Sequence, residues 1–266
     1  MKTQEEKLNY LIEKFKEESL EYKNAEIPKT IEDKKVLLRS LMNIRPPKEI
    51  ANEILKIQDE YLTERANQKG IVYLKDIKTI PSSNKISVWQ GDITRLSCDA
   101  IVNAANSRML GCFVPMHICI DNCIHTFAGV QLRNECNKIM SEFRKKYGTD
   151  YKQPTAVPII TDGFNLPAKK VIHVTGPIVT TKLTTELEQD LSNCYKNILD
   201  MCLQHNLKSV AFCCISTGVF NFPNKRAAEI AVKTVTNWLK ENENKMDRII
   251  FNVFKQEDKL LYENLL

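Results

Sequence analysis

The sequence predicts an α/β fold in which helices cover both faces of a mixed or mostly parallel sheet. Three observations predict this class. Short apolar segments that suit strands recur after Ser82, stretches with helical patterning alternate with them, and the segment before Ser82 shows helical patterning alone. Strands that alternate with helices typically lie parallel in one sheet. We therefore expect a helical segment followed by an α/β domain.

The first 80 residues predict about three helices. Apolar side chains recur there at the spacing of one helix face, prolines interrupt the pattern, and Gly70 is the single glycine. The apolar positions are Leu8, Leu11, Ile12 and Phe15, then Val36, Leu37, Leu38 and Leu41, then Ile50, Ile54, Leu55, Ile57 and Leu62. A segment of this size buries little surface alone, so it should pack on the rest. We place an all-helical N-terminal extension at 1–80 and an α/β domain at 81–266.

The α/β part alternates six strands with four helices. The expected strands are 85–89, 100–102, 156–160, 170–174, 209–213 and 248–253, and the expected helices are about 120–147, 184–205, 224–242 and 256–265. Two strands run into loops with glycine and small polar residues, at 91–94 and 216–218. In open α/β sheets, ligands bind beyond the carboxyl ends of the strands, so these loops are candidate binding segments.

Composition excludes several classes of protein. The 266 residues are 43% apolar, which allows one sizeable core, and the net charge of +5 comes from interspersed charges without a long basic block. We therefore do not expect nucleic acid as a partner. No apolar stretch approaches 18 residues and no apolar signal segment is apparent, so we expect a soluble cytoplasmic protein without a membrane partner. Nine cysteines should then be reduced thiols, buried side chains or metal ligands.

Three candidate metal ligands fall within eight residues. Cys112, His117 and Cys119 have the spacing C-x₄-H-x-C, and two thiolates with one imidazole suit Zn²⁺. Three protein ligands leave one tetrahedral position for water or substrate, as in catalytic sites, whereas structural sites close with four. Cys123 could be a fourth ligand, but we favour a core position for it. Inert buried cysteines are the alternative, although Pro115 and the short spacings indicate a loop, where these side chains have little packing role.

Two further segments suit a nucleotide. Residues 215–220, Ile-Ser-Thr-Gly-Val-Phe, lie between a strand and a helix, so their backbone N–H groups could approach a phosphate. The same residue types also serve turn geometry alone. Asp92, in Gly-Asp-Ile-Thr, could accept a hydrogen bond from an adenine amine or could cap the next turn. Asn103 and Asn106 close another strand, where amides bind ribose hydroxyls or loop backbone.

Other polar candidates are expected to be structural. His125 falls within a predicted helix, and His173 falls on an inner strand. The adjacent Cys213 and Cys214 point to opposite faces of one strand, so we expect no redox role for them.

Over roughly residues 82–266 the chain resembles the macrodomain family. The segments Gly-Asp-Ile-Thr, Asp-Ala-Ile-Val-Asn-Ala-Ala-Asn, Ile-Asp-Asn-Cys-Ile-His and Ile-Ser-Thr-Gly-Val-Phe occur in the family's order. The resemblance implies a three-layer α/β/α domain with a mixed central sheet and an ADP-ribose pocket. Where many members carry several glycines, only Gly111 remains, and the 112–119 window replaces that loop. This departure resembles the zinc-dependent macrodomains, which also carry a helical N-terminal leader.

The resemblance implies a role for each matching residue. Asp92 and Ile93 match the adenine end of the ligand site. The residues that match the diphosphate site are Ser216, Thr217, Gly218, Val219 and Phe220, with Phe220 also against the distal ribose. The residues that match the distal ribose site are Asn106, Ile120 and Asp121, and Cys119 belongs to the substrate-binding set as well. Cys112, His117 and Cys119 match the ligands of one zinc ion.

The implied function is zinc-dependent removal of mono-ADP-ribose from protein side chains. The resemblance implies cleavage at C1″, with aspartate or glutamate esters as the expected linkage and a lipoyl-carrier protein, modified by a sirtuin-type transferase, as a candidate partner. Asp121 would act as general base or orient a water, and Asn106 would fix the sugar. Two alternatives stay open: a non-catalytic ADP-ribose reader with a structural zinc, and an O-acetyl-ADP-ribose deacetylase.

Overall fold

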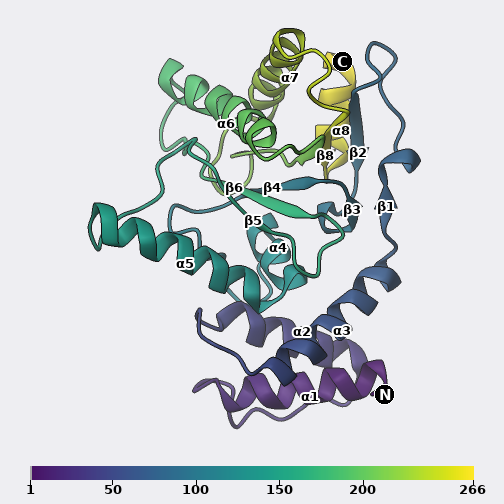
Figure 1. Ribbon diagram of the computed structural model, residues 1–266, viewed down its shortest axis with the longest axis vertical. Coiled ribbons are helices and arrows are strands. Elements are labelled where there is room, and N and C mark those ends of the chain that lie inside the picture. The colour runs from purple at the N-terminus through teal and green to yellow at the C-terminus, as the bar shows by residue number, and fades with distance from the viewer. Residues whose placement is uncertain (1) are drawn as a thin grey trace. The chain divides into compact units, whose positions relative to one another are not determined.

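The computed structural model describes residues 2–266, which form two compact units (Figure 1). The helical unit contains the chain up to Gly70 together with Leu110–Asp150 and Phe164–Leu166. The sheet unit contains Ile71–Met109, Tyr151–Gly163 and Pro167–Leu266. The chain therefore passes between the units several times. The predicted division of the sequence at residue 80 stays a prediction about its organisation.

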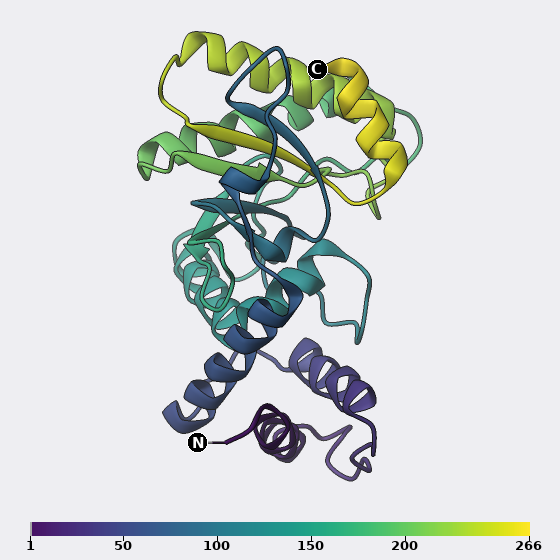
Figure 2. The same cartoon turned by 90° about the vertical axis from the view of Figure 1, so that its right-hand side faces the viewer.

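Within residues 2–266, the helical unit contains five helices. They are α1 (Gln4–Glu17), α2 (Ile31–Ile44), α3 (Asn52–Lys69), α4 (Ile120–Ala128) and α5 (Val130–Tyr147). The side chains of Thr3 and Thr30 accept hydrogen bonds from backbone N–H groups in the first turns of α1 and α2, which fixes where both helices begin. The first three helices, purple to blue in Figure 2, pack together.

A continuous apolar cluster holds this unit together. Its buried members come from α1, α2 and α3, and α5 adds Val130. They are Leu8, Leu11, Ile12, Phe15, Leu38, Leu41, Met42, Ile57, Tyr61, Leu62 and Val130. Most of these are the positions whose helical spacing predicted the helices. Burial of such faces supplies most of the stability of short helices in proteins.

The predicted single helix at 120–147 is divided in two. Gly129 separates α4 from α5 with a φ of 97°, a left-handed conformation that side chains with a Cβ rarely adopt. A Cβ at this position would lie 2.7 Å from Nε2 of Gln58. The uninterrupted apolar periodicity hid this break, which the glycine alone marked in the sequence.

The sheet unit contains a six-stranded mixed sheet. Its strands, in the order in which they lie, are β2 (Ile86–Gln90), β8 (Arg248–Val253), β7 (Ser209–Phe212), β4 (Ala100–Ala104), β6 (Lys170–Val174) and β5 (Ile159–Asp162). All neighbouring pairs are parallel except β5 with β6. The expected mixed sheet is therefore confirmed. The strand expected at 156–160 begins later, at Ile159, because Ala156 has a φ of 61°.

Three further helices belong to the sheet unit. They are α6 (Thr185–Gln204), α7 (Asn224–Glu241) and α8 (Gln256–Leu265). Helices α6 and α7 pack on each other over one side of the sheet (Figure 1). Short elements complete the unit: β1 (Val72–Tyr73) pairs with β3 (Leu96–Ser97), and the 3₁₀ turns are η1 (Leu74–Asp76) and η2 (Ile93–Arg95).

The sheet order brings three candidate loops to one edge. Strands β2, β4 and β7 all run in the same direction, so their carboxyl ends lie on the same edge of the sheet. Asp92 follows β2, Asn106 follows β4, and residues 215–220 follow β7. The fold of the sheet unit therefore positions these segments where parallel α/β sheets bind ligands.

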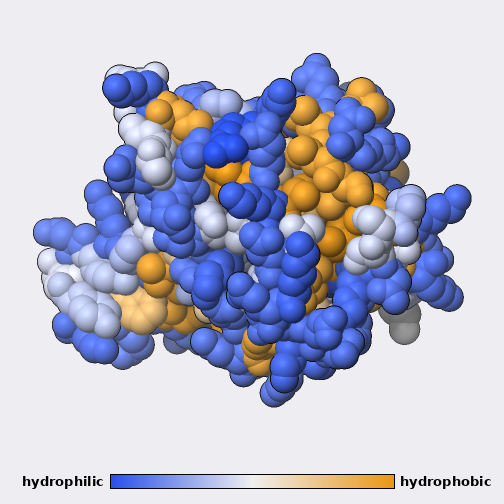
Figure 3. All heavy atoms as spheres, turned by 90° about the horizontal axis from the view of Figure 1, so that it is seen from above, coloured by the Kyte–Doolittle hydropathy of each residue, from blue (hydrophilic) through white to orange (hydrophobic). Residues whose placement is uncertain are grey.

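The face of the protein that Figure 3 draws is largely polar. Hydrophilic side chains cover most of the face in Figure 3, and apolar side chains gather in a band on it. Among the described residues, none of the helices combines the length and apolar composition needed to span a membrane.

Candidate metal centre and nucleotide-binding loops

Three predicted metal ligands lie together in the helical unit. The Sγ atoms of Cys112 and Cys119 and a ring nitrogen of His117 all lie within 4.8 Å of one another. Cys112 Sγ is 3.4 Å from Nδ1 of His117. The loop between them turns back on itself at Met116, where φ is 56°. This is the donor set that the C-x₄-H-x-C spacing predicts, and its atoms are close enough to share one ion.

The environment of the thiols fits a soft divalent cation. Burial raises the pKa of Cys119 to about 12, although a hydrogen bond from the backbone N–H of Asn122, 3.4 Å from Sγ, opposes the rise. The neighbouring Cys112 raises it further, because two thiolates repel each other. A cation between the sulfurs would compensate that charge, and thiolate and imidazole are ligands that zinc prefers. The residues therefore fit zinc.

Cys123 is not part of this group. The ligand atoms that cluster in this loop belong to Cys112, His117 and Cys119, and Cys123 is not among them. Nη2 of Arg39 lies 3.5 Å from the Sγ of Cys123 and donates to it. The expectation that Cys123 is not a fourth ligand stays a prediction.

Asp121 is buried directly beside this loop. It lies in the first turn of α4, two residues after Cys119, which is the N-cap of that helix. Its Oδ1 is 3.5 Å from Nε2 of His125, one helical turn later. Gly111 allows the loop to approach the same ring, because it has a φ of 81° and a Cβ there would lie 2.8 Å from it. His125, expected to be structural, therefore neighbours a candidate catalytic carboxylate, as sequence reasoning did not foresee.

The loop after β7 has the form of an anion-binding turn. Ser216 has a φ of 66°, and its carbonyl accepts a hydrogen bond from Phe222 N–H at 3.0 Å, which closes the loop. Within the described part of the chain, no protein acceptor pairs with the backbone N–H groups of Gly218, Val219 and Phe220. Val219 is 71% exposed. Consecutive unpaired N–H groups near the start of a helix, here α7, suit a phosphate.

Asp92 and Asn106 both organise their own loops. Oδ1 of Asp92 accepts hydrogen bonds from the backbone N–H and the hydroxyl of Thr94, at 3.0 and 2.6 Å, so Asp92 caps η2. Ile93 is buried beneath it. Oδ1 of Asn106 accepts from the backbone N–H of Arg108 at 3.0 Å. The capping interpretation of Asp92 is thus realised, and the nucleotide roles of all three residues stay proposals.

His173 is a buried neutral side chain inside the sheet unit. Its Nδ1 lies 3.0 Å from Nδ2 of Asn103 and its Nε2 lies 2.9 Å from the hydroxyl of Thr161. Burial lowers its pKa from 6.5 to about 3. The structure places it in the core, as predicted, and shows that Asn103 is its partner. Burial also raises the pKa of Cys213 to about 12, which keeps that thiol protonated at neutral pH.

The lowered pKa of His173 predicts a dependence of stability on pH. The unfolded chain binds a proton near pH 6.5, whereas the folded chain does so only near pH 3, so acidification between these values favours unfolding. The free energy of unfolding should fall by up to about 1.4 kcal/mol per pH unit from this residue. Denaturant unfolding between pH 4.5 and 7 should show a shallower dependence of the free energy of unfolding on pH in His173→Gln than in wild type. Equal slopes in the two proteins would contradict this assignment.

Comparison with known proteins identifies the family. Residues 102–231 match the family model described as Macro domain. A protein-ADP-ribose hydrolase of Treponema medium is 48% identical over 266 residues, which cover 99% of each chain. This chain belongs to the macrodomain family. A protein-ADP-ribose hydrolase of Staphylococcus aureus is 44% identical to this macrodomain over 100% of this chain and 97% of its own. The macrodomain also resembles the Trypanosoma brucei macrodomain solved with ADP-ribose, with a TM-score of 0.64 and 28% identity over 85% of this chain and 94% of that chain.

The predicted site residues therefore fall into two sets. Within the helical unit the structure brings together Cys112, His117, Cys119, Ile120 and Asp121. At one edge of the sheet unit it brings together Asp92, Ile93, Asn106 and the loop 215–220.

Proposed function

We infer that this macrodomain is a hydrolase that removes ADP-ribose from modified protein. Two relatives named protein-ADP-ribose hydrolase match it along nearly the whole of both chains, at 48% and 44% identity. A similar macrodomain of known structure holds ADP-ribose. The open N–H groups of residues 218–220 suit the diphosphate of that ligand. The family, the relatives and the chemistry of the loop thus agree.

We propose further that the hydrolase depends on zinc, held by Cys112, His117 and Cys119. The observation that carries this proposal is the grouping of three soft ligand atoms immediately before the catalytic candidate Asp121. When bound, zinc supplies a Lewis acid that stabilises negative charge on oxygen and lowers the pKa of bound water to about 7 in favourable sites. The absence of Cys123 from the group favours a catalytic rather than a purely structural metal.

The chain's own residues supply proton transfer and positioning. Asp121 lies in the first turn of α4, next to the N-cap residue Cys119. Asp121 can accept a proton from water as the water oxygen bonds to C1″. The bond from C1″ to the protein side chain breaks as the water oxygen attacks, and the side-chain oxygen leaves with the electron pair of that bond. Asn106 is proposed to hold the distal ribose during this step.

The proposed linkage is an ester of aspartate or glutamate. A carboxylate leaves C1″ more readily than a neutral amide or an alcohol does. Its departure therefore needs the least help from an acid or a positive charge in the site. A lipoyl-carrier protein is the proposed protein partner, and the cytoplasm the proposed compartment, both through the resemblance to zinc-dependent macrodomains.

Removal of metal from the full-length protein tests the proposal. We expect one zinc per chain by mass spectrometry, and a fall of about 100-fold or more in the release of ADP-ribose from an ester-linked protein after chelation. Zinc should restore the rate, whereas magnesium should not. Full activity of metal-free protein would refute zinc dependence. Binding of ADP-ribose without any release would instead support a reader, and faster turnover of O-acetyl-ADP-ribose would support a deacetylase.

A further inference from the structure

Helix α2 of the N-terminal extension directly contacts the loop of residues 112–119, called here the metal loop. Arg39 and Asn43 are one helical turn apart and so share a face of α2. Oδ1 of Asn43 accepts a hydrogen bond from the backbone N–H of Met116 at 3.1 Å. Nη2 of Arg39 donates to the carbonyl of His117 at 3.1 Å. Two side chains of the extension therefore hold the backbone at a metal ligand and at the residue before it.

The same two side chains reach α4, where the loop ends. Arg39 donates through Nε and Nη2 to Oδ1 of Asn122, at 3.2 and 2.8 Å. Nδ2 of Asn43 donates to the hydroxyl of Thr126 at 2.9 Å. Asn122 in turn donates from Nδ2 to the carbonyl of Val114 at 3.0 Å and from its backbone N–H to Cys119 Sγ at 3.4 Å. One polar network thus connects α2 to the loop and to a ligand sulfur.

Arg133 of α5 ties the beginning of the loop to the end of α2. Its guanidinium donates to the carbonyl of Asn43 at 2.8 Å and to the carbonyl of Arg45, while Nε donates to Leu110 at 2.8 Å. The cation also lies 4.1 Å from the ring centroid of Phe113. The hydrogen bonds from this buried guanidinium to carbonyls at the C-terminus of α2 fix the orientation of both groups.

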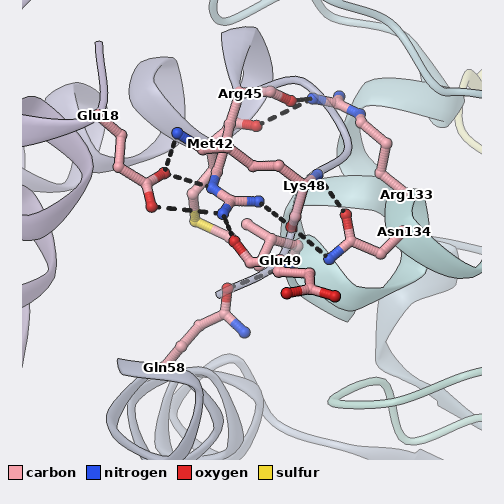
Figure 4. Close-up of polar contacts among 9 residues, drawn as sticks. Glu18, Met42, Arg45, Lys48, Glu49, Gln58, Arg133 and Asn134 are labelled. Carbon is pink, nitrogen blue, oxygen red and sulfur yellow. Dashed lines mark hydrogen bonds and ion pairs between the residues drawn. The ribbon is translucent and has the colours of Figure 1, made fainter. Parts of the chain in front are cut away.

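Figure 4 shows the hydrogen bonds that connect α5 to the end of α2 and the segment after it. Arg133 points to the carbonyls of Met42 and Arg45, and Asn134 exchanges two hydrogen bonds with the backbone of Lys48, at 3.0 and 2.9 Å. Arg45 pairs with Glu18, with Nε and Oε2 2.6 Å apart. This clamp fixes the position of α2, and hence of Arg39 and Asn43.

We propose that Arg39 and Asn43 are positioning residues of the metal loop, so that the N-terminal extension is required for tight zinc binding. The proposal rests on the zinc site proposed above. Asn43 and Asn122 are 1% and 0% exposed, so loss of a hydrogen-bond partner leaves buried polar groups unpaired. Because such groups are unfavourable, we expect the loop to shift from its position. Groups that orient metal ligands typically contribute about 10–100-fold to metal affinity.

Zinc affinity of four full-length variants tests this role. Arg39→Met and Asn43→Ala should raise the zinc dissociation constant about 10–100-fold, measured by competition with a chromophoric chelator. Arg39→Lys keeps the charge but loses the two hydrogen bonds from Nε and Nη2 to Asn122, so its zinc dissociation constant should rise less than that of Arg39→Met. Arg65→Met is the matched control, because Arg65 lies on α3 of the same extension and its side chain donates to Gln68. This control should bind zinc as wild type does.

The absorption spectrum of the cobalt-substituted protein gives a second readout. Altered sulfur-to-cobalt charge-transfer bands are expected in Arg39→Met and Asn43→Ala, because their loops present the thiolates differently. Should Arg39→Met fail to fold, Arg39→Lys and Asn43→Ala decide. A wild-type dissociation constant and spectrum in those two variants would overturn the positioning role. Absence of zinc binding by wild-type protein would instead overturn the proposed zinc site itself.

Discussion

Replacing His117 with alanine is expected to abolish stoichiometric zinc binding and to lower turnover by about 100–1,000-fold. His117 supplies the only nitrogen among the three clustered ligand atoms, and without it two sulfurs remain. Two ligands hold zinc far more weakly than three, and the reaction then loses its electrostatic stabilisation. Zinc content by mass spectrometry and single-turnover release of ADP-ribose from an ester-linked protein provide the measurement.

His205→Ala is the control for this variant. His205 is exposed at the C-terminal end of α6 in the sheet unit, so its loss should change neither zinc content nor turnover. ADP-ribose binding should persist in His117→Ala, because the diphosphate loop belongs to other residues. A His117→Ala protein that keeps one zinc and the wild-type rate would show that this loop is not the metal centre.

Gly218→Glu is expected to weaken ADP-ribose binding by about 100-fold. Gly218 lies in the middle of the proposed diphosphate loop, and a Cβ there meets no atom within 4 Å, so the chain itself tolerates a side chain. A carboxylate about 4 Å from a phosphate costs about 4 kcal/mol at an effective dielectric constant of 20, and salt screening at this exposed position reduces that cost. Isothermal titration with ADP-ribose measures the change.

Gly218→Gln separates charge from size. It adds a side chain of the same length without the charge, so its affinity should fall much less than that of Gly218→Glu. The difference between the two variants should shrink as salt concentration rises. Equal affinities in Gly218→Glu and Gly218→Gln at low salt would mean that no phosphate lies at this loop.

Periodicity predicted most of the fold because the burial pattern is regular. Strands β6 and β8 and helix α8 have the expected bounds, and the other main strands and helices of the sheet unit begin or end within a few residues of theirs. The misplaced features depend on backbone conformation at single residues. Gly129 divides a helix that apolar spacing alone extends, and the positive φ of Ala156 delays β5. Neither conformation leaves a trace in hydrophobic patterning.

The cluster of candidate metal ligands could be predicted because its residues are chemically unusual and close in sequence. Cys112, His117 and Cys119 need only a loop to come together. The residues that hold this loop could not be found in the same way, because Arg39 and Asn43 are about 70–80 residues distant and resemble ordinary polar positions on an amphipathic helix. Their role follows from tertiary contacts alone. The extension thus contributes to the site through its polar face, whereas sequence reasoning used only its apolar face.

X-ray absorption at the zinc edge of the full-length protein tests the central claim most directly. We predict two sulfur ligands at about 2.3 Å and two lighter ligands at about 2.0–2.1 Å, one from His117 and one not supplied by a cysteine. Addition of ADP-ribose should leave the two sulfurs in place. A third sulfur, which Cys123 would have to supply, would contradict an open catalytic position and leave zinc as a structural ion.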